Sequence, residues 1–390
     1  MSNHIYLDHS ATTPVHPDVV AAMQPYWHEQ YGNASSGHQQ GRASNRGLAQ
    51  ARRTIADWLH ANPNDIIFTG CGSEADNLAL RGVMWAAREA GRGNHLITCA
   101  VEHPAVLKTA KQLRDLANFD LTILPVDQYG QIDLGQLRAA IRPDTVLISL
   151  MVANNEIGTY QPFLEAGAIA HEHNILFHTD AVQAAAHLAW DMTTMPIDLL
   201  TLAPHKFYGP KGIGILYIRP NTPLLSPLTG GSQENGHRAG THNVPLAVGA
   251  AAAFDFVQSN RQQHLDHYQP LRDQLINGVR NLFPSTECQL TGHPTNRLAH
   301  HTSFAFNNIS GNDLVINLDM MGICAASGSA CSTGNPKPSS ILEAINLSPD
   351  WTTGGLRLTV GLHNTPADID ATLDKLPRVI KQLRQFQQTI

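Results

Sequence analysis

The sequence predicts an α/β fold built on a mostly parallel sheet with helices on both faces, joined to a smaller α/β unit. Three observations carry this prediction. The chain has 390 residues and is 42% hydrophobic, which is too much for one small core. Between about residues 60 and 220, short apolar runs alternate with longer amphipathic segments. After residue 231 this alternation gives way to a Gly-rich loop and long helical patterns.

Seven apolar runs rich in β-branched residues are expected to form the strands of the large sheet. Segments with helical periodicity separate them, the first being SEADNLALRGVMWAAREA. Such crossover connections make neighbouring strands parallel, with helices covering both faces of the sheet. Ligands of these sheets bind beyond the C-terminal ends of the strands. The runs are, in order, IIFTG, HLITCA, LTILPV, TVLISLMV, ILFHTDA, IDLLTLA and GIGILYI.

The region after residue 231 predicts the smaller unit. An Ala-rich segment over residues 244–258 and a polar helical run over residues 261–283 indicate long connecting helices. Beyond them, the apolar segments HTSFAFN, GICAASGSA and GLRLTVG alternate with two further helical patterns. We therefore expect a large domain over residues 15–259 and a small domain made of residues 1–14 and 260–390.

Composition excludes several classes of protein. The formal net charge is −6 and no basic run is present, so the positive surface that nucleic-acid binding requires is missing. Apolar runs fall far short of the roughly 20 residues of a membrane span, and the N-terminus lacks a secretory leader pattern. The five cysteines are scattered and form no C-x-x-C pair, which disfavours disulfides and zinc. We expect a cytoplasmic protein without nucleic acid, membrane or metal.

The segment TLAPHKFYGPKGIGILY places Lys206 between an apolar strand and a Gly/Pro turn. A lysine buried at a strand end has a lowered pKa, so its amine is suited to Schiff-base chemistry. Asp180 ends another apolar run, where an acid could protonate the ring nitrogen of a pyridoxal cofactor, and Gln183 follows in the turn. The alternatives are a solvated loop lysine and an aspartate that caps a helix.

A phosphate site is predicted where FTGCGSEADNLAL passes from a strand into a helix. The backbone amides at Gly72 and Ser73 would point at an anion there, although Ser73 could equally cap its helix. His103 in VEHPAV follows another strand, where an imidazole could stack on a cofactor ring and move protons near neutral pH. Because the chain has 21 histidines, a purely structural role for His103 is the alternative.

Taken together, these segments resemble the cysteine desulfurases within the fold-type I pyridoxal-phosphate enzymes. Ten blocks match in the family's order and near its spacing, and they span nearly the whole chain. The resemblance implies a class V aminotransferase-like fold that binds pyridoxal 5'-phosphate. The blocks are YLDHSATTP, YGNASSGHQQGR, FTGCGSEADNLAL, VEHPAV, ANNEIG, HTDAVQ, PHKFYGPKG, GGSQENGHRAGTHN, SGSACSTG and GLRLTVGLHNT.

The resemblance implies roles for the residues that contact the cofactor. Lys206 matches the lysine that binds the cofactor covalently, and Asp180 matches the partner of the ring nitrogen. Gln183 matches the contact to the ring's phenolic oxygen, and His103 matches the histidine stacked on the ring. His205 matches a phosphate ligand.

The resemblance also implies how substrate and partner chain contribute. Asn155 and Arg357 match the groups that hold the substrate carboxylate, with Asn155 also near the cofactor. Thr241 matches the residue that reaches the phosphate of a neighbouring subunit, which implies a homodimer. Cys331, in the Cys loop of the small domain, matches the nucleophile. Ala203 departs from the family, which usually has Ser or Thr there and so gains one phosphate hydroxyl.

The activity implied is conversion of L-cysteine to L-alanine, with a persulfide formed on Cys331. The loop SGSACSTGNPKPSSIL resembles that of desulfurases which supply an iron–sulfur scaffold protein, with thiolation proteins as the next acceptor. Other reactions on the same fold remain as alternatives: selenocysteine lyase, cysteine C–S lyase and aminotransferase. A catalytically silent scaffold that only binds partners is the non-enzymatic alternative.

Overall fold

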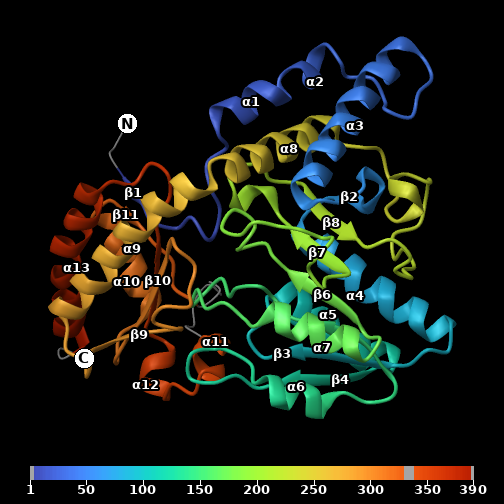
Figure 1. Cartoon of the computed structure of the whole chain (residues 1–390). Helices are drawn as coiled ribbons and strands as arrows, with labels where there is room; N and C mark the ends of the chain where they lie inside the picture. The colour runs from blue at the N-terminus through green and yellow to red at the C-terminus, as the bar shows by residue number, and fades with distance from the viewer. Residues whose placement is uncertain (1–3, 329–337, 388–390) are drawn as a thin grey trace.

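The computed structural model describes residues 4–328 and 338–387. Figure 1 shows a large sheet unit on one side and a smaller unit, formed mainly by the C-terminal part of the chain, on the other. The seven-stranded sheet has the order β2-β8-β7-β6-β5-β3-β4. Its strands are β2 (Ile66–Thr69), β3 (His95–Cys99), β4 (Asp120–Leu124), β5 (Thr145–Ser149), β6 (Leu176–Asp180), β7 (Leu199–Leu202) and β8 (Gly214–Ile218).

The sheet is mostly parallel, as the sequence predicts. Strands β4, β3, β5, β6 and β7 pair in parallel, whereas β8 is antiparallel to both β7 and β2. Strands β2, β3, β5 and β8 are buried along their whole length. Burial on both faces is what a continuous apolar run, rather than an alternating one, requires.

Helices cover both faces of this sheet. Residues of α4 (Gly72–Glu89) and α5 (Pro104–Ala117) pack in a core on one face. A larger core on the other face includes residues of α3 (Gln39–Leu59), α7 (Phe163–Glu172) and α8 (Val244–Ser259). The shorter helices α1 (Pro17–Met23), α2 (Pro25–His28) and α6 (Leu134–Ala140) complete this unit.

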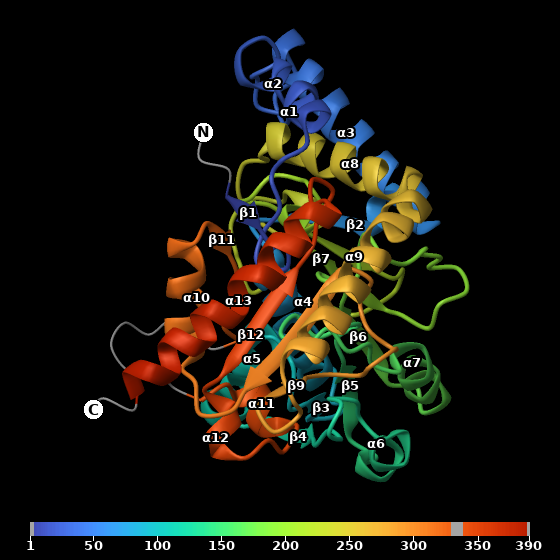
Figure 2. The same cartoon turned by 90° about the vertical axis from the view of Figure 1, so that its left-hand side faces the viewer.

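The smaller unit has its own core. Its antiparallel sheet has the order β12-β10-β9, formed by Gly355–Thr359, His301–Phe306 and Cys288–Leu290. Two long helices, α9 (Arg261–Leu282) and α13 (Pro366–Gln387), pack beside each other against it (Figure 2). Further elements are α10 (Gly311–Met320), α11 (Ser340–Ala344) and α12 (Pro349–Thr352). The domain boundaries given above stay a prediction.

The N-terminal segment connects the two units. Strand β1 (Ile5–Tyr6) pairs in parallel with β11 (Ile323–Cys324), and Leu7 is part of the core of the smaller unit. A few residues further on, the Thr13 amide donates to the His205 carbonyl at 2.9 Å, beside the large sheet. The segment therefore lies across the junction of the two units.

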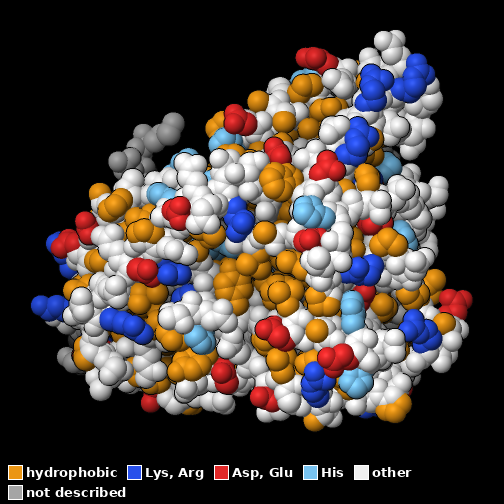
Figure 3. Space-filling model, viewed as in Figure 1, with side chains coloured by type: hydrophobic (Ala, Val, Ile, Leu, Met, Phe, Trp, Pro, Cys, Tyr) orange, Lys and Arg blue, Asp and Glu red, His pale blue; other side chains and the backbone are white. Residues whose placement is uncertain are grey.

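The surface in Figure 3 mixes acidic and basic side chains without a region of one sign, in keeping with the modest net charge. Within residues 4–328 and 338–387, no helix is both long and apolar enough to span a membrane.

Candidate active site

A cavity of about 220 Å³ lies at the C-terminal ends of β6 and β7 and the start of α4. This is the edge at which parallel sheets bind ligands. Eight of the nine residues predicted to bind the cofactor line it, and the ninth, Thr241, does not. The lining is Cys71, Gly72, Ser73, Asp76, His103, Met151, Ala153, Asn155, Asp180, Val182, Gln183, Ala203, His205 and Lys206.

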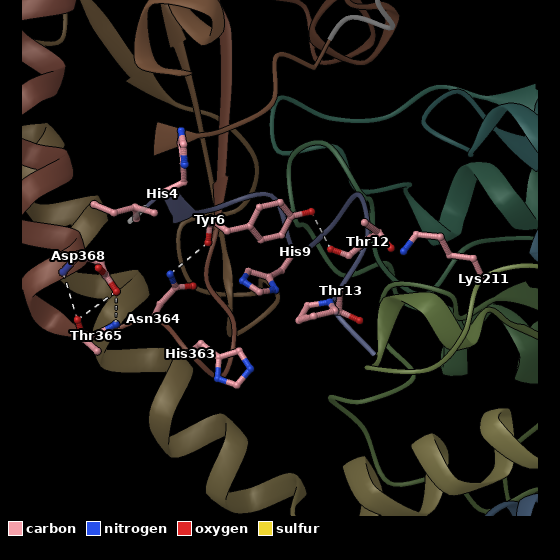
Figure 4. A pocket seen from close by; sticks show the side chains of 12 residues that line it. His4, Tyr6, His9, Thr12, Thr13, Lys211, His363, Asn364, Thr365 and Asp368 are labelled. Atoms are coloured by element: carbon pink, nitrogen blue, oxygen red, sulfur yellow. Dashed lines mark hydrogen bonds between the residues drawn. The ribbon is translucent and has the colours of Figure 1, made fainter. Parts of the chain in front are cut away.

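A larger cavity, of about 790 Å³, contains none of the predicted site residues. Figure 4 shows it between the N-terminal segment and the start of α13. The Tyr6 hydroxyl donates to the Thr12 carbonyl at 3.0 Å, and the Asn364 amide donates to the Tyr6 carbonyl at 3.1 Å. Thr12 lies between the two cavities, because its hydroxyl is 3.2 Å from Nδ1 of His205. Size alone therefore does not identify the site.

Lys206 ends a single 3₁₀ turn that follows β7. Its ammonium donates to the carbonyls of Ser10 at 2.6 Å and Ala11 at 2.7 Å. Burial and the positive charge of Arg357 lower the pKa of Lys206 to about 8. A substantial fraction of the neutral amine is therefore present near pH 7.5, as a nucleophile or base requires.

Asp180 is the last residue of β6, and its side chain is buried. Its carboxylate accepts a hydrogen bond from the Val182 amide at 2.8 Å. Burial raises the pKa of Asp180, whereas the nearby His103 and Lys206 act in the opposite direction. Gln183 follows in the same turn and donates to the Ser10 carbonyl at 3.0 Å, so the N-terminal segment is held over this part of the cavity.

His103 is the N-cap of α5, and its Nδ1 accepts a hydrogen bond from the Ala105 amide at 3.1 Å. In the neutral ring the proton therefore resides on Nε2. Burial lowers the pKa of His103, Asp180 opposes this shift, and Lys206 adds to it. Near neutral pH the ring is therefore a neutral group that donates from Nε2.

The start of α4 provides an anion site. Cys71 is its N-cap and makes no side-chain capping bond, so the first amides of the helix are directed at the cavity without a competing acceptor. A Cβ added at Gly72 would lie 3.2 Å from Cβ of Ala203 and 3.3 Å from Val182. Gly72 therefore keeps this end of the cavity open, beside the exposed Ser73.

Arg357 of β12 lies beside the cavity and is mostly buried. Its guanidinium donates from Nη1 to the Asn155 carbonyl at 2.9 Å and from Nη2 to Asp8 at 2.7 Å. The buried Nε has no hydrogen-bond partner among the described residues. Because Nε is closed to solvent and both Nη atoms are paired, the guanidinium would accept a ligand carboxylate after turning away from Asp8 or Asn155.

Two of the predicted site residues that the structure describes do not line this cavity: Arg357 lies beside it, and Thr241 lies elsewhere. Thr241 lines a separate cavity of about 190 Å³ with Thr69 and Gly70. Cys331 lies outside the described residues. On the described side of that gap, the Ser339 hydroxyl donates to Glu156 at 2.9 Å, next to Asn155 at the edge of the site.

Sequence reasoning missed three residues of this region. Asp76 lines the cavity, Ser10 provides a carbonyl for both Lys206 and Gln183, and Asp8 pairs with Arg357. The signal available for Asp76 was a carboxylate one turn after Ser73, near the start of the predicted helix. Backbone carbonyls such as that of Ser10 carry no side-chain signal.

Comparisons with known proteins agree with this geometry. The family model for class-V aminotransferases matches residues 5–372. A cysteine desulfurase IscS of Methanosarcina thermophila is 45% identical over 98% of this chain and 93% of its own length. A second cysteine desulfurase IscS, of Dictyoglomus turgidum, is 41% identical over 98% of this chain and 96% of its own length.

Solved structures give the same result and confirm the predicted fold. A NifS-like protein superposes with a TM-score of 0.90 at 33% identity, covering 97% of this chain and all of that one. The structure of SspA in complex with cysteine superposes with a TM-score of 0.79 at 34% identity, covering 93% and 100%. The chain belongs to the class-V aminotransferase family and, within it, to the cysteine desulfurases.

Proposed function

We propose that this chain is a pyridoxal-phosphate-dependent cysteine desulfurase, which converts L-cysteine to L-alanine and places the sulfur on Cys331. One observation carries the proposal most strongly. Lys206, with a pKa lowered to about 8, and the buried Asp180 share one small cavity whose other end is a helix N-terminus. An amine, an acid and a phosphate site in this arrangement suit a pyridoxal cofactor.

The cavity fits that cofactor at both ends. The open start of α4 at Gly72, together with Ser73 and His205, would hold the phosphate. Asp180 would face the ring nitrogen, and His103 would lie against the ring. When bound, the cofactor supplies an electron sink for a carbanion at the substrate Cα.

The protein side chains would position cysteine and move its protons. Arg357, whose guanidinium donates to the Asn155 carbonyl, would turn to bind the substrate carboxylate. Lys206 would remove the proton from the substrate Cα and later return one, since its lowered pKa permits both steps near neutral pH. Asp180 would keep a proton on the ring nitrogen.

Sulfur transfer would follow at Cys331. Its thiolate attacks the substrate sulfur, a sulfur–sulfur bond forms, and the carbon–sulfur bond breaks with its electron pair remaining on the substrate. Protonation then gives alanine, so cysteine and the Cys331 thiol become alanine and a Cys331 persulfide. The persulfide sulfur would pass to an iron–sulfur scaffold protein or a thiolation protein. The names of the IscS relatives support this class of acceptor.

The test is an anaerobic incubation with L-cysteine in which alanine and protein persulfide are measured together. Cys331→Ser should reduce alanine by orders of magnitude, because an alcohol is a poor sulfur acceptor. Cys324→Ser is the matched control, since Cys324 is a partly exposed thiol in the same region of the sequence. Alanine at the parent rate in Cys331→Ser would reject the nucleophile.

The alternative activities give different products in the same experiment. Pyruvate in place of alanine would indicate a C–S lyase, and turnover of selenocysteine alone would indicate a selenocysteine lyase. A purified protein that holds no cofactor and forms neither product would indicate a silent scaffold.

We also propose a homodimer in which Thr241 of each chain completes the phosphate site of the other. The position of Thr241, away from the cavity of its own chain, supports this arrangement. Lys206→Ala and Thr241→Ala chains should each be impaired as homodimers. Mixed dimers should regain activity, because one site then has Lys206 from one chain and Thr241 from the other. No gain on mixing, with mixed dimers present, would contradict shared sites.

A further inference from the structure

Asp76 is a buried carboxyl group for which the mechanism above has no role. It lies in the second turn of α4, is 1% exposed, and lines the cofactor cavity. Its Oδ1 has no hydrogen-bond partner among the described residues. Asp76, Asp180 and His103 each have a ligand atom that lies within 4.8 Å of the other two. Two carboxyl groups therefore share one buried space.

The surroundings of the two carboxyl groups differ. Asp180 accepts from the Val182 amide and is close to Lys206 and His103, which favour its ionised form. Asp76 has no lysine or arginine as a partner among the described ion pairs. Its nearest base is His178, whose Nε2 lies 3.6 Å from Oδ1. Burial lowers the pKa of His178 to about 3, so this imidazole is neutral and supplies no positive charge.

Burial and the nearby acidic groups also disfavour a charge on Asp76. Burial and the negative charge of Asp180 raise the pKa of Asp76, and Glu102 and Cys71 add to this effect. Among the described groups acting on it, the Thr201 hydroxyl favours the ionised form. Two buried carboxylates this close do not both ionise, and the one without cationic neighbours keeps the proton.

We infer that Asp76 is a neutral carboxylic acid in the working enzyme and is a positioning residue for Asp180, so that the pair carries one negative charge, placed at the ring nitrogen. This inference rests on the proposed function for the role of Asp180. A second charge at Asp76 would compete with Asp180 for the proton on the ring nitrogen. It would also stabilise the ammonium form of Lys206 and so reduce the free amine.

The first test compares the purified enzyme, with its cofactor, to Asp76→Asn by chemical denaturation between pH 4 and 8. A folded carboxyl group with a raised pKa contributes stability that is full below the unfolded pKa of about 4 and is lost as the pH rises. Asparagine does not titrate. The variant should therefore be as stable as the parent near pH 4 and more stable than the parent at higher pH. The ratio of the two unfolding equilibrium constants should change by up to tenfold per pH unit.

Glu234→Gln is the matched control, because Glu234 is a buried carboxyl group with the opposite environment. It pairs with Arg52 at 2.6 Å, and despite the cost of burial, His242 and Arg52 lower its pKa to about 2. This variant should lose stability at neutral pH relative to acid pH. Equal or lower stability of Asp76→Asn across the whole range would overturn the inference.

The second test detects the protonated carboxyl group directly and does not depend on how stability varies with pH. Infrared spectra of the parent enzyme at pH 7 should contain the C=O stretch of a protonated carboxyl group that is lost in Asp76→Asn. Absence of such a band at pH 7 would mean that Asp76 is ionised. Neither readout measures turnover, so the inference can fail while alanine is still formed, and it can hold if the proposed reaction fails.

Discussion

Burial sets the protonation states of several side chains around the site. It lowers the pKa of Lys206 to about 8 and raises that of Glu102 to about 8 and that of Glu156 to about 7. Glu102 nevertheless accepts a hydrogen bond from the Met151 amide at 2.7 Å, so its oxygen is still used. The site therefore gathers groups that exchange protons near neutral pH, as acid–base catalysis requires.

At the scale of one residue, Ala203 gives a direct prediction. Ala203→Ser adds a hydroxyl to the end of the cavity beside Gly72. One net hydrogen bond to the phosphate is worth about 1 kcal/mol, so we expect cofactor retention to tighten about fivefold. Equilibrium dialysis of the cofactor measures this. Ala203→Cys, of similar size but a weak donor, is the control, and an unchanged affinity in Ala203→Ser would show that another group already fills this role.

Most of the residues that line the cavity could be predicted from the sequence. Lys206, Asp180 and His103 each follow an apolar run, and the C-terminal ends of neighbouring strands meet at one edge. Asp76 could not be assigned, because its environment is created by Asp180 from a distant part of the chain. Helical position alone does not indicate whether a carboxyl group has cationic neighbours.

At the scale of an element, the position of α4 depends on Gly214 in β8. A Cβ at Gly214 would collide with the Cys71 backbone carbonyl and lie 2.6 Å from Thr69 Oγ1. Gly214→Ala should therefore displace the start of α4, destabilise the protein by roughly 1–3 kcal/mol, and weaken cofactor binding. Thermal unfolding and dialysis measure the two effects. Gly37→Ala is the control, because a Cβ there meets nothing within 4 Å, and a loss of the same size in both variants would refute the steric argument.

Element positions were easier to predict than strand directions. The seven apolar runs correspond to the seven strands of the large sheet, since burial on both faces selects continuous apolar segments. The antiparallel direction of β8 was not evident from its run, GIGILYI. The residues of an apolar run do not indicate in which direction the strand runs in the sheet. Only the 3₁₀ turn at Lys206, which stands in place of a crossover helix, indicates that the chain reverses.

At the scale of the whole molecule, histidines lie between the two units. The rings of His187 and His300 stack with centroids 4.5 Å apart, and His300 is 3.1 Å from the Ser10 hydroxyl. Burial lowers the pKa of His187 and His9 to about 4 and that of His300 well below its ordinary value, with neighbouring histidines contributing. These rings are therefore neutral in the folded protein.

This arrangement predicts instability in acid. A histidine with a lowered pKa contributes stability that is present above the unfolded value of about 6.5 and is lost as the pH falls. The denaturant concentration at the unfolding midpoint should decrease as the pH is lowered from 6.5 to 4.5. His187→Phe should reduce the slope of the unfolding free energy against pH by the equivalent of up to one proton. His28→Phe, at an exposed position, should leave this slope unchanged. An identical slope in all three proteins would place the acid sensitivity elsewhere.

The N-terminal segment finally bears on how the protein is synthesised. A growing chain folds from its N-terminal part onward, yet β1 pairs with β11, and the carbonyls of Ser10 and Ala11 cover Lys206. Strand β1 must therefore wait until β11 has been synthesised. We expect a ribosome-bound chain to form the large sheet while its cavity stays incomplete, which delays cofactor loading, and with it the release of sulfur, until β11 has been synthesised and has paired with β1.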